Sequence, residues 1–134
     1  MNFARVMTQL GQALEAVDGL RVFPYPANTV VPPAVVVGWP APITPDTLAR
    51  GGESITFPVL VAVGKADIQS ARDALGAYLD GSDPAGVPRA LERGTYTACD
   101  AVRVTEKRVE PVSIAGIEYL AAVLDVQVTG TGGQ

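Results

Sequence analysis

The stretch LDGSDPAGVPRALE, residues 79–92, brings several residues that could do chemistry close together in the sequence. Its aspartates, serine and glutamate have the composition of a calcium-binding loop or an acid/base site. An EF-hand loop needs oxygen ligands at its first, third and fifth positions, glycine at the sixth and glutamate at the twelfth. Counted from Asp80, the fifth, sixth and twelfth positions are Pro84, Ala85 and Leu91. The calcium-loop register therefore fails at three positions.

The same stretch is also a poor acid/base site. Asp80 or Asp83 would have to lie near a second carboxylate in a cleft, and the local sequence predicts an exposed turn. Asp80 and the glycine after it are typical of a helix end, and Asp83-Pro84 is typical of a turn. Gly86 and Gly94 bracket a short helix. We interpret the stretch as a helix stop, a proline turn and a helix start.

The rest of the chain offers few catalytic groups. It contains no histidine, which removes Ser-His and Cys-His nucleophiles and the usual zinc ligands. The single cysteine, Cys99, is followed by Asp100. We predict that Cys99 is a small buried hydrophobe in a strand, because a reactive thiol needs an electropositive setting. No phosphate-binding or dinucleotide-binding loop pattern is present. We expect no catalytic, metal or cofactor site, and we expect that the protein is not an enzyme.

Composition and charge limit the partners. The net charge of −4 argues against a freestanding nucleic-acid binder, which needs a basic footprint. Charged residues make up 18% of the chain and hydrophobic residues 48%, so part of the surface is expected to be covered, and oligomerisation would do this. The N-terminus lacks a signal-peptide core and there is no run of about 20 apolar residues. We expect synthesis in the cytoplasm and no membrane insertion.

Apolar periodicity predicts two main helices and one short helix. Residues 3–18 carry an apolar stripe at three- and four-residue steps, with Asn2 as N-cap. A second helix runs over residues 67–81 from an N-cap at Asp67, and Gly76 within it indicates close packing. The third helix covers residues 87–94.

Apolar runs and alternation predict the strands, at residues 20–23, 34–39, 55–64, 98–112 and 116–130. The unbroken run after Pro33 predicts burial on both faces, and Trp39 is interpreted as a core or interface anchor. Pro58 indicates an edge position or a bulge. Gly116 supplies the positive φ of a hairpin between the last two strands.

Two segments are predicted to be irregular. Residues 41–54 form a long loop with a short helical turn from Pro45 to Gly51; ordering against a neighbouring subunit and simple disorder are both open for it. Residues 130–134 are predicted to be a frayed tail. The whole chain, residues 1–134, is then one α+β domain. Its sheet is mostly antiparallel, and the helices pack on one face.

The order of these elements resembles a known family. The carrying features are the connector LDGSDPAGVPRAL, the terminal strand GIEYLAAVLDVQV, the proline-bounded VVPPAVVVGWP and the ITFPVLVAVG strand. Together they are similar to the tail terminator, or tail-completion, proteins of long-tailed bacteriophages, particularly those of actinobacterial hosts. The resemblance spans nearly the whole chain and rests on no catalytic motif.

The resemblance implies a structural virion protein at the head–tail junction. Members of that family form a ring, typically hexameric, that caps the tail tube and ends addition of the major tail protein. The ring then offers a docking face to the head-completion or connector protein, and DNA passes through its lumen. No cofactor or membrane partner is implied. Assembly would take place in the host cytoplasm.

Specific residues can be assigned to such a ring. Exposed apolar side chains suit subunit or partner interfaces, and the candidates are Ile43, Leu48, Val112, Ile114 and Ile117. Arg103 and Lys107 alternate along one predicted strand with Thr105 between them, so they should share a face, with Arg108 on the opposite one. Arg103 and Lys107 are the candidates for a lumen that faces DNA.

Two other readings remain open from the sequence. The chain could be another neck component, such as a head-completion or connector protein, which would differ in the partner that each ring face meets. It could also be a small-molecule-binding α+β domain, which would need a pocket with convergent polar groups.

Overall fold

The computed structural model describes residues 2–17, 19–24, 32–40, 43–46, 52–65, 69–82, 86–114 and 116–131. The fold is α+β with a mostly antiparallel sheet and three helices, as the sequence predicts. The elements in chain order are α1 (Phe3–Leu14), β1 (Arg21–Phe23), β2 (Ala34–Val37), β3 (Ile43–Asp46), β4 (Gly52–Lys65), α2 (Gln69–Leu79), α3 (Val87–Arg93), β5 (Ala101–Ile114) and β6 (Ile117–Thr131).

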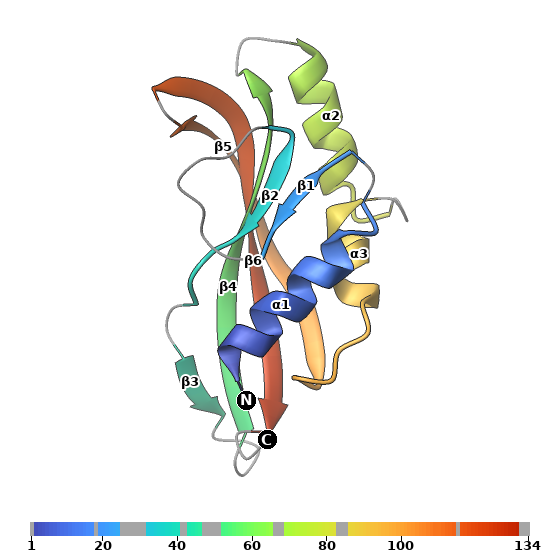
Figure 1. The fold of residues 1–134 in the computed structure, drawn as a ribbon, viewed down its shortest axis with the longest axis vertical. Helices are drawn as coiled ribbons and strands as arrows, with labels where there is room; N and C mark the ends of the chain where they lie inside the picture. Colours follow the sequence, from blue (N-terminus) through green and yellow to red (C-terminus); the bar gives the residue numbers. More distant parts are fainter. Residues whose placement is uncertain are drawn as a thin grey trace.

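The sheet has six strands, in the order β1-β2-β4-β6-β5, with β3 also paired to β4 (Figure 1). Every pairing is antiparallel except β1 with β2, which is parallel. The long strands β4, β5 and β6 form its backbone. Figure 1 shows α1 crossing one face of the sheet, and α2 and α3 lie at the right of the view.

Helix α1 begins where the sequence predicts. The side chain of Asn2 accepts hydrogen bonds from the backbone N–H groups of Ala4 (3.0 Å) and Arg5 (3.3 Å), which satisfies donors that have no partner within the helix. Its apolar stripe is buried against the sheet. The helix ends at Leu14, four residues earlier than predicted, although Val17 beyond it is still buried.

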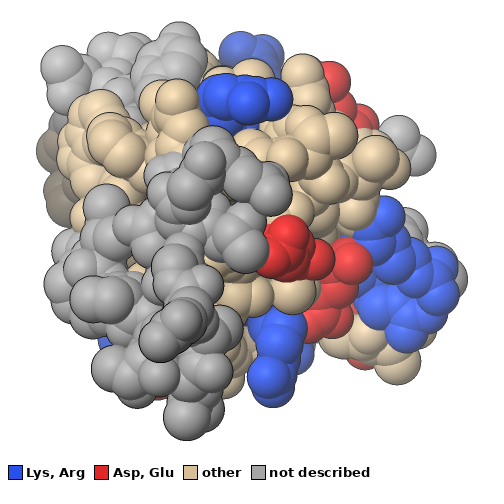
Figure 2. Space-filling view, turned by 90° about the horizontal axis from the view of Figure 1, so that it is seen from below, with Lys and Arg blue, Asp and Glu red and all other residues tan. Residues whose placement is uncertain are grey.

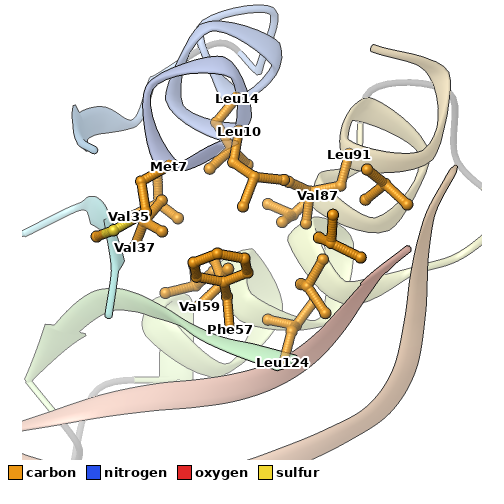
Figure 3. Close-up of a cluster of buried hydrophobic side chains, with 14 of the residues drawn as sticks. Met7, Leu10, Leu14, Val35, Val37, Phe57, Val59, Val87, Leu91 and Leu124 are labelled. Atoms are coloured by element: carbon orange, nitrogen blue, oxygen red, sulfur yellow. The ribbon is translucent and has the colours of Figure 1, made fainter. Parts of the chain in front are cut away.

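The core lies between the helices and one face of the sheet (Figure 3). Alternate residues of β4, including Phe57 and Val59, point into it, and so do alternate residues of β6, including Leu124. The helices contribute Leu10 and Leu91 from the other side. A smaller apolar cluster on the sheet contains Ala34 and Val36 with Phe23 and Leu60 packed against them. All four residues of β2 are buried, which confirms the prediction of burial on both faces.

Pro58 lies inside β4, at a place where the strand is locally an edge. Strand β2 pairs with residues 59–62 of β4 and β3 pairs with residues 52–55. Pro58 falls between these two segments, and its carbonyl oxygen accepts a hydrogen bond from the N–H of Gly38 (2.7 Å). The missing N–H is tolerated here because Pro58 lies just beyond the last paired residue of β2, where the ladder ends.

The prediction of one irregular segment over residues 41–54 is wrong in two places. Ile43–Asp46 is strand β3, antiparallel to the start of β4, and β4 itself begins at Gly52. A helical turn beginning at Pro45 is therefore excluded, because Pro45 pairs with Glu53 in the sheet. The prediction of a frayed tail from residue 130 is wrong at its start, since β6 continues to Thr131, and residues 132–134 lie outside the described residues.

The last two strands form the predicted hairpin. Ile114 pairs with Ile117, and Gly116 in the turn has φ 81°, a conformation that a side chain would strain. The two strands pair along nearly their full length, with an irregularity between Val104 and Glu106 where β5 has one extra residue. That bulge changes which face the rest of β5 presents.

Candidate functional site

The turn after α2 carries the first of the candidate carboxylates. The carboxylate of Asp80 accepts hydrogen bonds from the backbone N–H (2.9 Å) and the hydroxyl (2.7 Å) of Ser82. The hydroxyl and backbone hydrogen bonds from Ser82, together with the charge of Lys107, lower the pKa of Asp80. A carboxylate used in this way closes a helix end, so the prediction of a structural turn is confirmed at this residue. Asp83 lies outside the described residues.

The glutamate at the end of the same stretch is also engaged structurally. A carboxylate oxygen of Glu92, on α3, accepts a hydrogen bond from the backbone N–H of Val104 (3.1 Å). This bond satisfies a donor near the start of the edge strand β5. Asp80 and Glu92 thus serve different contacts and do not form an acid/base pair. Within the described part of the chain, no three His, Cys, Asp or Glu side chains gather closely enough to hold a metal ion.

Cys99 and Tyr96 lie in the segment between α3 and β5. Cys99 is buried in the core, and burial, with a smaller contribution from Asp100, raises the pKa of its thiol. A raised pKa disfavours the nucleophilic thiolate. The prediction of a small buried residue is confirmed, but Cys99 precedes β5 and does not lie in a strand. The Tyr96 hydroxyl donates a hydrogen bond to the carbonyl oxygen of Leu91, and burial raises the pKa of this phenol.

The bulge in β5 separates the two candidate basic residues. Arg103 pairs with Gln127, whereas Lys107 pairs with Leu124. Because Gln127 and Leu124 are three residues apart in a regular strand, they point to opposite faces. Lys107 is on the helix side, where its Nζ donates to the carbonyl oxygen of Leu79 (3.1 Å). The prediction that Arg103 and Lys107 share a face is therefore wrong, because the extra residue shifts the alternation.

The helix-free face of β5 carries mixed charges instead of a basic stripe. Arg108 pairs with Val123 and lies on the same face as Asp125, with which it makes an ion pair of 3.4 Å. Glu106 pairs with Asp125 directly. The lower end of the molecule, seen along its long axis in Figure 2, also has acidic side chains next to basic ones. Alternating signs of this kind are typical of a solvated face.

The apolar interface candidates divide among several places. Ile117 is 42% exposed, and Val112 is half-buried in the same hairpin. Ile114 is the residue paired with Ile117 next to the turn. Ile43 lies in β3, paired with Ile55, and Leu48 lies outside the described residues. The structure thus brings Val112, Ile114 and Ile117 together at one hairpin end and places Ile43 on another strand pair.

Two further exposed apolar residues lie outside the five interface candidates, and one of them, Trp39, was interpreted from the sequence as a core or interface anchor. Val109 is 61% exposed and Trp39 is 63% exposed. Regular alternation from Val102 and Val104 would place Val109 on the helix-free face, whereas the bulge places it on the helix-side face, paired with Ala122, where it stays exposed. Trp39 follows a strand that is buried throughout, and its sequence neighbours gave no sign that the core ends at Val37. Trp39 is therefore not a core anchor.

Two comparisons with known proteins give no relative. No protein-family model matches the chain, and no curated protein is significantly similar to it. Among the described residues there is no helix long and apolar enough to cross a membrane.

Proposed function

We propose that this protein is a structural subunit that assembles into a ring, in the manner of a phage tail terminator. In that role the ring caps the tail tube, stops addition of the major tail protein and offers a face to the head-completion or connector protein. The observation that carries the proposal is the end of the β5–β6 hairpin, where Ile117 on one face is 42% exposed and Val109 on the other face is 61% exposed. A surface of this kind marks a site of protein–protein contact.

Strand β5 is at the edge of the sheet, and its features favour a subunit contact through side chains over pairing with a strand of another subunit. An exposed edge strand pairs readily with another chain unless it carries a bulge, charges or proline. Strand β5 has all three: the bulge at Thr105, alternating charges after it, and Pro111. A subunit contact through the outward-pointing side chains of the hairpin is consistent with this protected edge.

For the lumen, the proposal uses the helix-free face of the sheet. Arg103 lies on this face, and Lys107 does not. The carboxylates of Glu106 and Asp125 lie on it with Arg103 and Arg108. A wall with both signs of charge suits the passage of DNA, because a strongly basic wall would retain the duplex through its phosphates.

The direct test is the assembly state of the purified protein. Light scattering should give a multiple of the chain mass, and negative-stain images should show closed rings with a central hole. Mixing with the major tail protein should cap its tubes at one end. Rings that bind a head-completion protein but leave tail tubes uncapped would favour the other neck role. A protein that stays monomeric and binds no tail component contradicts the proposal.

A further inference from the structure

A shallow groove of about 320 Å³ runs between the C-terminal part of α1 and helix α3. Small residues make up much of its lining, and its polar groups come from one glutamine, one threonine and two arginines. The lining residues are Gln12, Ala13, Ala16, Arg89, Ala90, Arg93, Gly94 and Thr95. None of them is a carboxylate. The small side chains allow an incoming chain to approach the two helices closely.

The two arginines of the groove lie together, with no carboxylate among the lining residues. Arg89 and Arg93 are four residues apart on α3, so they share a helix face, and like charges at this spacing destabilise a helix by about 0.2–0.5 kcal/mol. Within the described part of the chain, the buried Nε of Arg89 has no hydrogen-bond partner. A buried donor without an acceptor is unfavourable. A carboxylate from outside would supply the charge opposite to the two guanidinium groups.

The β5–β6 hairpin end has the complementary composition. It carries two exposed glutamates, Glu110 and Glu118, with exposed apolar side chains beside them. The register places one glutamate on each face of the hairpin. Glu110, paired with Ala121, is on the helix-free face with Ile117, and Glu118, paired with Ser113, is on the helix-side face with Val109. Each face therefore combines one carboxylate with one exposed apolar residue.

We propose that the α1–α3 groove receives the β5–β6 hairpin end of a second copy of this chain, with Arg89 and Arg93 binding the glutamate of the hairpin face that docks. This inference rests on the proposed ring and names the contact that builds it. The hairpin end and α3 lie on opposite sides of the molecule (Figure 1). A contact between two different surfaces on opposite sides is heterologous, and such contacts repeat head to tail and form a ring when the rotation between copies closes.

Charge reversal tests the contact directly. One variant reverses the groove, Arg89→Glu with Arg93→Glu, and the other reverses the hairpin, Glu110→Arg with Glu118→Arg. In each variant alone, groove and hairpin have the same sign, so self-association should weaken by at least about tenfold in dissociation constant. Mixed in equal amounts, each variant offers what the other needs, and assembly should return in alternating order. Far-UV circular dichroism of each variant controls for folding.

The outcomes separate this inference from the ring proposal. If the wild-type chain shows no self-association, the ring and the groove contact both fail. If the wild-type chain assembles and both variants assemble equally well, the ring stands and the groove contact is overturned. If the groove variant assembles normally but no longer binds the major tail protein, the groove belongs to that partner and the second-copy assignment is wrong. Single reversals at Glu110 and Glu118 identify the hairpin face that docks.

Discussion

Tyr96 links the end of α3 to the segment that leads into β5. Its hydroxyl donates to the carbonyl oxygen of Leu91, one of the last carbonyl groups of the helix. Such groups have no partner within the helix and need one from elsewhere. Burial holds the pKa of this phenol above its ordinary value of 10.0. The hydrogen bond and the titration of Tyr96 can therefore be separated by pH.

We expect Tyr96→Phe to lower the free energy of unfolding by about 1 kcal/mol at pH 7, because the buried acceptor of Leu91 is left without its donor. At alkaline pH the substitution should have the opposite effect: the wild-type protein should lose free energy of unfolding through Tyr96 ionisation, and Tyr96→Phe should not. With Tyr96 present, stability is complete below pH 10.0 and falls above it, because the unfolded phenol ionises there while the folded one stays neutral. Urea unfolding between pH 7 and 11 measures both effects.

This comparison is best made in a Cys99→Ala background. The pKa of the Cys99 thiol is also raised by burial, so Cys99 contributes a loss of stability in the same direction as the pH rises past its ordinary value of 9.0. Without the thiol, any remaining difference in the pH dependence of stability between Tyr and Phe at position 96 is due to the phenol of Tyr96. An unchanged alkaline slope in Tyr96→Phe would show that the ionisation of Tyr96 is not linked to folding.

At the scale of the helices, two glycines have opposite surroundings. Gly11 is buried in α1, and a Cβ there would lie 2.6 Å from the Cβ of Pro24. Gly76 is exposed in α2, and a Cβ there would meet nothing within 4 Å. The prediction that Gly76 marks close packing is therefore wrong. The sequence gives both glycines as helix-weakening residues, and only the packed structure tells them apart.

We expect Gly11→Ala to destabilise the fold by about 1–3 kcal/mol through overpacking. The matched variant Gly76→Ala should stabilise it by about 1 kcal/mol, because alanine is the better helix former and has free space. Urea midpoints at one fixed protein concentration compare the two. A destabilising Gly76→Ala would mean that a neighbouring subunit packs against α2.

The bulge in β5 gives a second comparison at this scale. Lys107 donates to the carbonyl oxygen of Leu79 at the end of α2, where the negative end of the helix dipole also favours a cation. Lys107→Met should destabilise the fold by about 0.5–1 kcal/mol, because the lysine is exposed and its bond is partly screened. Arg103→Met, on the opposite face, should stay within about 0.5 kcal/mol of the wild type. Equal effects of the two substitutions would contradict the separation of the faces.

Some elements could be predicted well from the sequence because burial of one face alone determines their pattern of apolar residues. The alternation of β6 identifies Leu124, Val126 and Val128 as core residues because side chains of a strand alternate strictly and one face is buried. Strand β3 could not be found in this way. Its sequence, ITPD, contains proline and aspartate, which strands disfavour, and only pairing with the start of β4 makes it a strand. A bulge leaves no mark in the sequence either, because it depends on the partner strand.

Over the whole molecule, the sequence predicted the α+β class and the helices on one face, and it missed the arrangement of the first strands. Strands β1 and β2 are parallel, which pairing of consecutive strands as hairpins does not anticipate. Among the site residues, the hairpin positions come together because Gly116 defines the turn between them. The groove arginines could not be found from sequence, because the groove exists only once α3 packs beside α1, and the Nε of Arg89 then has no partner among the described residues.

The end of the β5–β6 hairpin can be tested as the surface through which subunits assemble. Replacing Ile114 and Ile117 by serine should shift the light-scattering mass toward the monomer, because the proposed contact would bury apolar surface, at roughly 25 cal/mol per Å². Folding should be little affected by Ile117→Ser, since Ile117 is 42% exposed. Phe3→Ser is the matched control, because Phe3 is 39% exposed and lies at the start of α1, outside the hairpin. If both substitutions reduce assembly equally, loss of apolar surface in general is responsible and the hairpin has no special role. If only the hairpin variant dissociates, the apolar end of β5 and β6 is the part of the fold that joins one subunit to the next.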